Sequence, residues 1–322
     1  MDVLYLREAE VEQLLTMEMA LEAVEAAFRA QAGGQVENHS RQRLHPSRGV
    51  YFHYMAAADQ TCGYFGGKLY TSSPTGTRFL IPLYQADTGA LVALLEADTL
   101  GRFRTGAASG VATNYMARPE AACVGLLGSG HQAPTQLLAL AKVRRLASVR
   151  VYSPNRERCR AFAEKMAAAL SLPVEAVASA EAAVREADIV VAVTTARQPV
   201  LQGAWLAPGT HVNAVGANFP EKRELDDAVI ARAARIVVDC REQSRDEAGD
   251  LVVPFASQPE RWQEVHELSE VVAGRFPGRG SPEEITLFKS NGVALEDVAT
   301  SARVYERARA EGVGRTLKMW EA

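Results

Sequence analysis

Gly128, Gly130 and Ala133 form a G-x-G-x-x-A pattern that follows the apolar run ACVGLL and precedes the amphipathic segment APTQLLAL. Glycines at these positions permit a tight turn and a close approach of the backbone to a pyrophosphate, and the N-terminus of a helix adds free N–H groups. Pro134 suits the first helical turn, where its missing N–H costs nothing. The pattern predicts a dinucleotide site that includes Gly128, Ser129, Gly130, His131 and Gln132.

The end of the next predicted strand, VRVYSPNRER, carries Ser153, Asn155 and Arg156. An NAD-selective site would place an acidic residue there to accept from the ribose 2′-hydroxyl. Arg156 or Arg158 could instead pair with a 2′-phosphate, although an arginine solvated on an arginine-rich helix is the alternative. The cofactor is therefore expected to be NADP(H) or NAD(H), with NADP(H) slightly preferred.

Two further predicted strands end in polar residues that would face the same crevice, because open α/β sheets bind ligands at the carboxyl ends of their strands. One strand ends at Thr194 and Thr195. The other ends in the stretch NAVGANFPEKREL, which contains Asn213, Val215 and Asn218. We expect the threonines, Asn213 and Val215 to contact the cofactor.

The elements that position these residues alternate between strand and helix patterns. Helices are predicted over about 132–143 and 156–170, between the strand-like runs ACVGLLG, SVRVYS, VEAV and DIVVAVTT, and further strands are predicted in THVNAVGA, RIVVDC and EITLFKS. This alternation is typical of a doubly wound parallel sheet. Upstream, residues 9–32 predict an amphipathic helix or helix pair, 44–95 a mostly antiparallel sheet, and 98–117 a helix of small residues.

Composition narrows the class of protein. A chain of 322 residues suggests two domains at ~150 residues each, and 48% hydrophobic residues can fill two cores. A net charge of -4 without blocks of like charge argues against a nucleic-acid or membrane partner. The four cysteines show no metal-ligand spacing, so no metal site is expected. Neither a signal peptide nor a membrane span is evident, and we expect a cytoplasmic protein.

Five segments, RTGAASGVAT, GLLGSGHQAPTQL, DIVVAVTT, PGTHVNAVGANFPEKRELD and ITLFKSNGVALEDVA, resemble in order and spacing the ornithine cyclodeaminase/mu-crystallin family. The resemblance implies an α/β homodimer. A Rossmann-type domain would span 119–295, and an α+β substrate-binding and dimerisation domain would be formed by residues 1–118 with 296–322. Family activities include ornithine cyclodeamination, alanine dehydrogenation, reduction of cyclic ketimines and other imino acids, and non-enzymatic ligand binding.

The resemblance gives roles to basic residues of the first domain. Arg41 matches a carboxylate-binding arginine, although Arg43 would share its face of a strand. An arginine fork suits a carboxylate because two parallel N–H donors meet two oxygens. Lys68 matches a second substrate lysine, and in a closed site beside Arg41 its proton affinity would fall, so that it could transfer protons.

The same resemblance extends the cofactor and substrate sites. Arg104 and Thr105 match positions that contact a cofactor phosphate, although a bridging arginine with an acidic partner is the alternative for Arg104. Lys222 matches a cofactor-contacting lysine. Ser290 joins the expected cofactor residues and Asn291 the substrate residues. His45, His53, Tyr70 and Arg78 are further candidates for the substrate pocket, without a spacing argument that ranks them.

The chain departs from the family pattern at Asn218, where ornithine cyclodeaminases carry an aspartate that is assigned proton transfer. An amide cannot act as a general base, but it can donate to and accept from a substrate. Reduction of a protonated imine requires mainly that the imine carbon be held against the nicotinamide. The residue therefore favours reduction over deamination.

These residues together predict an NAD(P)H-dependent imine reductase or amino acid dehydrogenase for a small 2-imino acid, or for a 2-oxo acid plus an amine. Lys68 and Asn218 are the expected catalytic residues. One alternative is an ornithine cyclodeaminase-type ammonia lyase that uses bound NAD. The second alternative is a non-enzymatic ligand-binding dimer like mu-crystallin.

Overall fold

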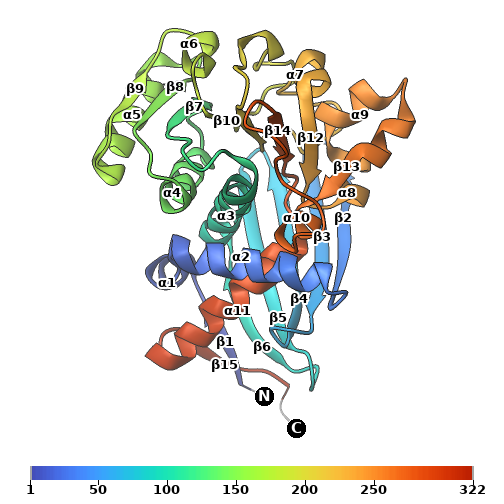
Figure 1. The fold of residues 1–322 in the computed structure, drawn as a ribbon. Coiled ribbons are helices and arrows are strands. Elements are labelled where there is room, and N and C mark those ends of the chain that lie inside the picture. Colours follow the sequence, from blue (N-terminus) through green and yellow to red (C-terminus); the bar gives the residue numbers. More distant parts are fainter. Residues whose placement is uncertain (1, 321–322) are drawn as a thin grey trace. The chain divides into compact units, whose positions relative to one another are not determined.

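The computed structural model describes residues 2–320, and the chain forms two compact units (Figure 1). The first unit holds the chain up to Arg104 and again from Gly292 onward, and the second unit holds Thr105–Asn291. No helix within the described residues has the length and apolar character needed to span a bilayer.

The unit boundary differs from the division expected after residue 118, because it falls inside helix α3 (Asp98–Met116). The second half of α3 packs on α4 (Ala133–Val143). A Cβ atom on Gly106 would lie only 2.4 Å from the carbonyl oxygen of Thr135 in α4, and Gln136 Nε2 donates to Thr105 O at 3.3 Å. This contact between backbones assigns the small-residue half of α3 to the second unit.

The first unit is built on a seven-stranded sheet in the order β15-β1-β6-β5-β4-β3-β2. Strands β2 to β6 pair antiparallel, which confirms the expected antiparallel sheet, and β1 adds to it parallel to β6. Its strands are β1 (Asp2–Leu6), β2 (Val36–Ser47), β3 (Val50–Asp59), β4 (Tyr64–Ser73), β5 (Gly76–Gln85), β6 (Leu91–Glu96) and β15 (Arg315–Lys318).

Helices pack on one face of this sheet. Residues 9–32 are expected to form one amphipathic helix or a helix pair, and the structure has two helices here, α1 (Glu8–Leu14) and α2 (Met17–Ala32). Helix α2 lies along α11 (Ala294–Glu311) (Figure 1). Helix α11 packs directly on β3 and β4, and nearly all of its first three turns are buried. The last helix therefore belongs to the first unit.

The second unit contains an eight-stranded, wholly parallel sheet in the order β13-β12-β14-β11-β10-β7-β8-β9, which confirms the Rossmann-type prediction. The chain winds outward in opposite directions from the neighbouring strands β7 and β10, so their carboxyl ends form a topological switch point. The strands are β7 (Cys123–Leu127), β8 (Ser148–Tyr152), β9 (Val174–Ala176), β10 (Ile189–Ala192), β11 (His211–Ala214), β12 (Ala233–Val238), β13 (Val265–Glu267) and β14 (Ile285–Lys289).

Hydrophobic cores cover both faces of the parallel sheet. One core includes Leu137 of α4 and Phe162 of α5 (Arg156–Leu170), and the other includes Val184 of α6 (Ala180–Val184) and Leu251 of α9 (Gly249–Phe255). Helices on both faces let the short strands be largely apolar. The remaining helices are α7 (Asp227–Arg232), α8 (Arg241–Glu247), α10 (Leu268–Val272) and the 3-10 turns Gly203–Trp205 and Pro259–Glu264.

A histidine interrupts this apolar sheet. His211 of β11 is fully buried, with Nδ1 2.9 Å from Thr286 Oγ1 and Nε2 3.3 Å from Asn213 Oδ1. Burial lowers the pKa of its imidazole to about 3, so the folded chain holds it neutral. The stability that it contributes is complete above the unfolded pKa near 6.5 and is lost as the pH falls toward 3.

We therefore expect the free energy of unfolding of the wild type to fall more steeply with acidification than that of His211→Gln, by about 5 kcal/mol once the pH is below the pKa of the folded state. Urea unfolding at a series of pH values measures this difference. His39→Gln, at an exposed ring, is the control and should follow the wild type. Parallel curves for the wild type and His211→Gln would contradict the expectation.

Candidate active site

The glycine-rich turn after β7 has the geometry that a bound pyrophosphate requires. Gly128 has a φ of +106°, and a Cβ atom there would lie 2.5 Å from Val193 O. A Cβ atom on Gly130 would meet nothing within 4 Å, so the backbone is open to a ligand at that point. Helix α4 begins at the buried Ala133, whose N–H donates to Gly130 O at 3.2 Å, so the glycine-rich turn leads directly into the helix N-terminus. The turn therefore fits a dinucleotide, with Ser129, His131 and Gln132 at its accessible side.

The predicted residues after β8 have two different roles, one as a helix cap and two as the lining of a cavity. Asn155 caps α5, because its Oδ1 accepts from Arg158 N at 2.9 Å. Ser153 and Arg156 line a cavity of about 130 Å³ together with Arg160. The structure thus brings two of the three predicted residues to one cavity, adds Arg160, and gives Asn155 a structural partner.

The ends of β10 and β11 carry the next predicted residues. Thr194 and Thr195 follow β10, and Thr195 is exposed. Val215 continues the ladder beyond β11, since its N–H donates to Ala192 O at 2.8 Å. Asn213 is fully buried, with Nδ2 donating to Thr113 Oγ1 at 2.9 Å and Oδ1 facing His211, so protein partners occupy its amide.

The loop that follows β11 holds Asn218 and Lys222, both partly buried. The Lys222 ammonium lies 4.7 Å from the centre of the Phe219 ring. The loop rests on the start of α9, where a Cβ atom on Gly249 would lie 2.1 Å from Lys222 O. A glycine under this loop lets the two backbones touch.

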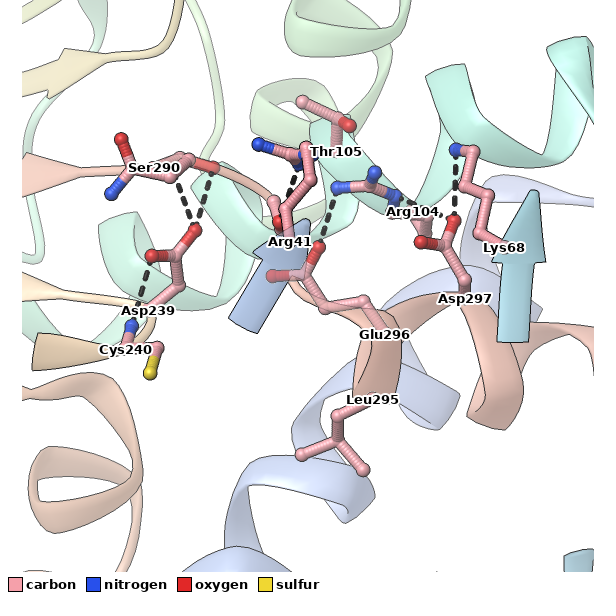
Figure 2. A network of polar contacts seen from close by, with 12 residues as sticks. Arg41, Lys68, Arg104, Thr105, Asp239, Cys240, Ser290, Leu295, Glu296 and Asp297 are labelled. Carbon is pink, nitrogen blue, oxygen red and sulfur yellow. Dashed lines mark hydrogen bonds and ion pairs between the residues drawn. The ribbon is translucent and has the colours of Figure 1, made fainter. Parts of the chain in front are cut away.

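Ser290 and Asn291 lie directly beyond β14 and are buried. The carboxylate of Asp239 accepts from Asn291 N at 2.6 Å and from Ser290 Oγ at 3.4 Å. Figure 2 shows this aspartate between Ser290 and the Cys240 backbone, from whose N–H it also accepts. Asn291 Nδ2 donates to Ser244 Oγ at 2.7 Å. The backbone at this strand end is fixed by an aspartate that the sequence pattern did not single out.

In the first unit, Lys68 of β4 and Arg104 of α3 meet two acidic residues at the start of α11 (Figure 2). Lys68 Nζ lies 3.1 Å from Asp297 Oδ1, and Arg104 Nε donates to the same oxygen at 2.9 Å. Arg104 Nη1 donates to Glu296 Oε2 at 2.8 Å. All four side chains are buried, so the ion pairs form in a medium of low dielectric constant.

Burial and neighbouring charges act in opposite directions on these two cations. Burial lowers the pKa of Lys68 to about 8, because the opposing attraction of Asp297 compensates only in part and Arg104 adds repulsion. Burial alone would also lower the pKa of Arg104, but the carboxylates of Asp297 and Glu296 outweigh it and raise that pKa. Arg104 is therefore a permanent cation, whereas Lys68 can exchange a proton close to neutral pH.

Glycines make room for this cluster. A Cβ atom on Gly101 of α3 would lie 2.7 Å from Lys68 Nζ, and one on Gly292 would lie 2.4 Å from Arg104 Nη1. Gly66 and Gly67, which precede Lys68, are required for a different reason. Cβ atoms there would clash with the carbonyl oxygens of the neighbouring strands β5 and β3. Strand packing therefore explains that pair of glycines.

Arg41 lies in the same unit and is buried, with Nη2 donating to Gly292 O at 2.9 Å. Arg43 is paired across the sheet with His53, whose ring stacks on Tyr70 at 4.2 Å. Burial, together with the nearby arginines, lowers the pKa of His53 to about 4. These side chains share the buried face of the sheet with Lys68.

Sequence reasoning missed Glu296 and Asp297, although both lie inside the quoted segment ITLFKSNGVALEDVA. Two acids in the first turn of a helix ordinarily complement its dipole at the surface. The small and apolar residues around them, GVALEDVA, were the available signal that this turn is buried. Among the described residues, no cluster of three His, Cys, Asp or Glu side chains could hold a metal ion.

Comparison with known proteins agrees with this architecture. The model of the ornithine cyclodeaminase/mu-crystallin family matches residues 1–312. A delta(1)-pyrroline-2-carboxylate reductase from Bacillus cereus is 39% identical over 240 residues, which cover 74% of each chain.

Two solved structures extend the similarity to the whole chain. The delta(1)-pyrroline-2-carboxylate reductase of Thermococcus litoralis, in complex with NADH and L-proline, is 35% identical with a TM-score of 0.94 and covers 98% of this chain and 100% of its own. An archaeal alanine dehydrogenase dimer with bound NAD is 34% identical with a TM-score of 0.93 and covers 99% and 100%. Motif order, fold and full-length similarity agree, and the chain belongs to the ornithine cyclodeaminase/mu-crystallin family.

Proposed function

We propose that the protein is an NAD(P)H-dependent imine reductase or amino acid dehydrogenase for a small 2-imino acid, or for a 2-oxo acid plus an amine. The observation that carries the proposal is the Lys68 ammonium, which is only 3% exposed and has three N–H donors. Within the part of the chain that the structure describes, Asp297 is its one hydrogen-bond acceptor. Buried donors require partners, and a substrate carboxylate or imine nitrogen would supply them.

Reduction of an imino acid adds a hydride to carbon and a proton to nitrogen, so that imine, NAD(P)H and a proton give amine and NAD(P)⁺. A bound reduced nicotinamide supplies the hydride. Lys68, with a pKa of about 8, is mostly protonated at neutral pH and could protonate the imine nitrogen, which makes the carbon a better hydride acceptor. Arg41 and the Nη2 group of Arg104 would bind the carboxylate or a cofactor phosphate. Asn218 would orient the nitrogen without taking its proton.

The two units would divide these tasks. The first unit is proposed to bind the substrate and to form the dimer. The second is proposed to bind the dinucleotide through the turn after β7 and through Thr194, Thr195, Val215 and Lys222. Relatives solved with NADH or NAD support a nicotinamide cofactor.

A substrate panel tests the proposal. Cyclic imino acids, and 2-oxo acids with ammonium or methylamine, are offered with NADH or NADPH, and we expect loss of reduced-nicotinamide absorbance in step with amino acid formation. Ammonia release from ornithine without net loss of absorbance would identify a cyclodeaminase instead. Cofactor binding without turnover across the panel would identify a ligand-binding protein.

The preference for NADP(H) rests on the cavity after β8. Ser153, Arg156 and Arg160 line it, and the chain has no acidic side chain among its lining residues. Two guanidinium groups beside one small cavity suit a 2′-phosphate better than a 2′-hydroxyl.

We expect Arg156→Ala to weaken NADPH binding roughly 10-fold through loss of a charge-assisted hydrogen bond, and to leave NADH binding unchanged. Fluorescence titration of both cofactors measures this. Arg158→Ala removes an exposed arginine of the same helix that does not line the cavity and is the matched control. Equal weakening of NADH and NADPH by Arg156→Ala would argue against the preference.

A homodimer is proposed through the face of the seven-stranded sheet opposite the helices. Leu44, Tyr54 and Leu80 are 55%, 38% and 37% exposed on it, and Phe52 stacks on Tyr54 at 5.9 Å. Cross-strand pairing places these side chains on one side, because Tyr54 pairs with Leu69 and Leu69 with Leu80. An apolar sheet face of this kind marks an interaction surface, and the dimeric alanine dehydrogenase supports a second copy as its occupant.

We expect light scattering to give a dimer for the wild type and a monomer for Leu80→Glu, because a carboxylate cannot be buried unpaired in an apolar interface. Val253→Glu, at an apolar residue of α9 that is 46% exposed, is the control and should remain dimeric. A dimeric Leu80→Glu protein would place the interface elsewhere.

A further inference from the structure

Glu224 is a fully buried acid in the loop beyond β11, within the charged run EKREL. Its two carboxylate oxygens accept from two separate strand ends. Oε1 accepts from Thr194 N at 2.5 Å, beyond β10, and Oε2 accepts from Gly216 N at 2.6 Å, beyond β11. One side chain thus ties together the backbones that leave neighbouring strands of the parallel sheet.

The backbone of Glu224 is itself held in place. Asp250 Oδ1, from the start of α9, accepts from Glu224 N at 2.7 Å and from Leu225 N at 2.9 Å. Lys289, at the end of β14, is fully buried with Nζ 3.8 Å from Asp250 Oδ2, and it donates to Ala214 O at 3.3 Å. Two carboxylates and one ammonium therefore lie under the carboxyl ends of β10, β11 and β14.

The Glu224 carboxylate and the Thr194 and Gly216 amides that donate to it, which we call the clamp, leave no room for an additional side chain. A Cβ atom on Gly216 would lie 2.1 Å from Thr194 O and 2.6 Å from Glu224 Oε1. The Gly216 and Thr194 backbones therefore approach each other closely beside the Glu224 carboxylate. A change in the clamp must therefore displace one of these backbones.

We propose that Glu224 is a positioning residue of the dinucleotide site, whose ionised carboxylate holds the Thr194 and Gly216 amides and so fixes the two strand ends that receive the nicotinamide half of the cofactor. This inference rests on the dinucleotide site proposed above, because Thr194 carries one of the two amides and Val215 directly precedes the other. It assigns to a buried acid a role that its position in a charged run does not suggest.

The proposal predicts a direction of pH dependence. Burial and the neighbouring Asp250 raise the pKa of Glu224 to about 7, against the opposing influence of Lys289 and of the amide donors. Burial also raises the pKa of Asp250, although Lys289 and Arg223 oppose it. A protonated Glu224 loses an acceptor for one of the two amides, so the clamp loosens as the pH falls through neutrality.

The test measures the dissociation constant of NADH by fluorescence titration, without turnover, from about pH 8 to about pH 6. NADH is used because it lacks the titrating 2′-phosphate of NADPH. We expect wild-type affinity to fall roughly 10-fold over this range. Glu224→Gln should bind weakly throughout and show no such fall. Asp250→Asn, which removes a neighbouring negative charge, should move the midpoint to lower pH.

Asp188→Asn is the matched control. Asp188 accepts from Ala122 N and Cys123 N, both at 2.9 Å, and so ties backbones at the opposite, amino-terminal edge of the same sheet. We expect it to keep the wild-type pH dependence even if it unfolds at a lower temperature.

Several outcomes would overturn the inference and leave the proposed function standing. These are a flat wild-type profile, a Glu224→Gln profile that matches the wild type, or an equal flattening by Asp188→Asn. If Glu224→Gln does not fold, the wild-type and Asp250→Asn profiles decide the question, and an unshifted midpoint contradicts it. Failure of the wild type to bind either NADH or NADPH would overturn the proposed function itself.

Discussion

Lys68→Met is expected to lower kcat for imine reduction by roughly 10³-fold and to leave the dissociation constants of NADH and NADPH within a few-fold. Methionine has a side chain of similar length and can still pack against Phe79, whose ring centre lies 4.8 Å from Lys68 Nζ. It lacks the ammonium group, so it cannot supply a proton or donate hydrogen bonds to the substrate. The residues proposed to bind the dinucleotide through the glycine-rich turn belong to the second unit, so cofactor binding should persist. Stopped assays of product formation and separate fluorescence titrations measure the two effects.

The wild-type pH profile supplies an independent check on Lys68. The rate of reduction should fall above a pH of about 8 as the ammonium loses its proton. Lys165→Met, at an exposed lysine of α5, is the control and should leave rate and profile unchanged. A Lys68→Met enzyme that keeps its rate, or that loses cofactor binding in proportion to its rate, would remove Lys68 from the proposed chemistry.

Asp297→Asn is expected to destabilise the first unit by about 3 kcal/mol, because it leaves the buried cations Lys68 and Arg104 with one fewer negative charge. It should also move the alkaline limb of the rate profile to lower pH. The carboxylate of Asp297 holds the pKa of Lys68 up against burial, and an amide cannot do so. Urea unfolding and the pH dependence of kcat measure the two consequences.

Glu296→Gln distinguishes the loss of stability from the shift of the alkaline limb. It removes the adjacent buried carboxylate, which binds Arg104 at 2.8 Å, whereas Lys68 is bonded to Asp297. We expect a comparable loss of stability with an unmoved alkaline limb. Identical pH profiles for Asp297→Asn, Glu296→Gln and the wild type would show that Asp297 does not set the protonation of Lys68.

Local signals explain which parts of the fold the sequence could predict. The turn at Gly128 follows an apolar strand and precedes a helix within a few residues, so its pattern is complete in a short window. The meander from β2 to β6 shows turn chemistry between β-like runs for the same reason. In contrast, β15 is a short edge strand, and the short β1 beside it is defined by its pairing with β6 far along the chain, as in Leu4 with Ala93.

The parts of the candidate site that the sequence could not reveal depend on contacts between distant residues. Lys68 and Asp297 are 229 residues apart, and the local sequence around neither residue indicates that the two side chains are in contact. Glu224 lies in a run that reads as a solvated loop, and only its burial between two strand ends distinguishes it from Glu221, which is exposed. The unit boundary inside α3 likewise depends on how Gly106 meets α4.

The most direct test of reduction follows the hydride. NADH or NADPH carrying deuterium at the transferring C4 position is incubated with the enzyme and the imino acid that gives turnover in the panel, and the amino acid product is analysed by mass spectrometry. The proposed function predicts one deuterium at the α-carbon of every product molecule, with no deuterium lost to solvent. Product without deuterium, formed while the reduced cofactor persists, would contradict it.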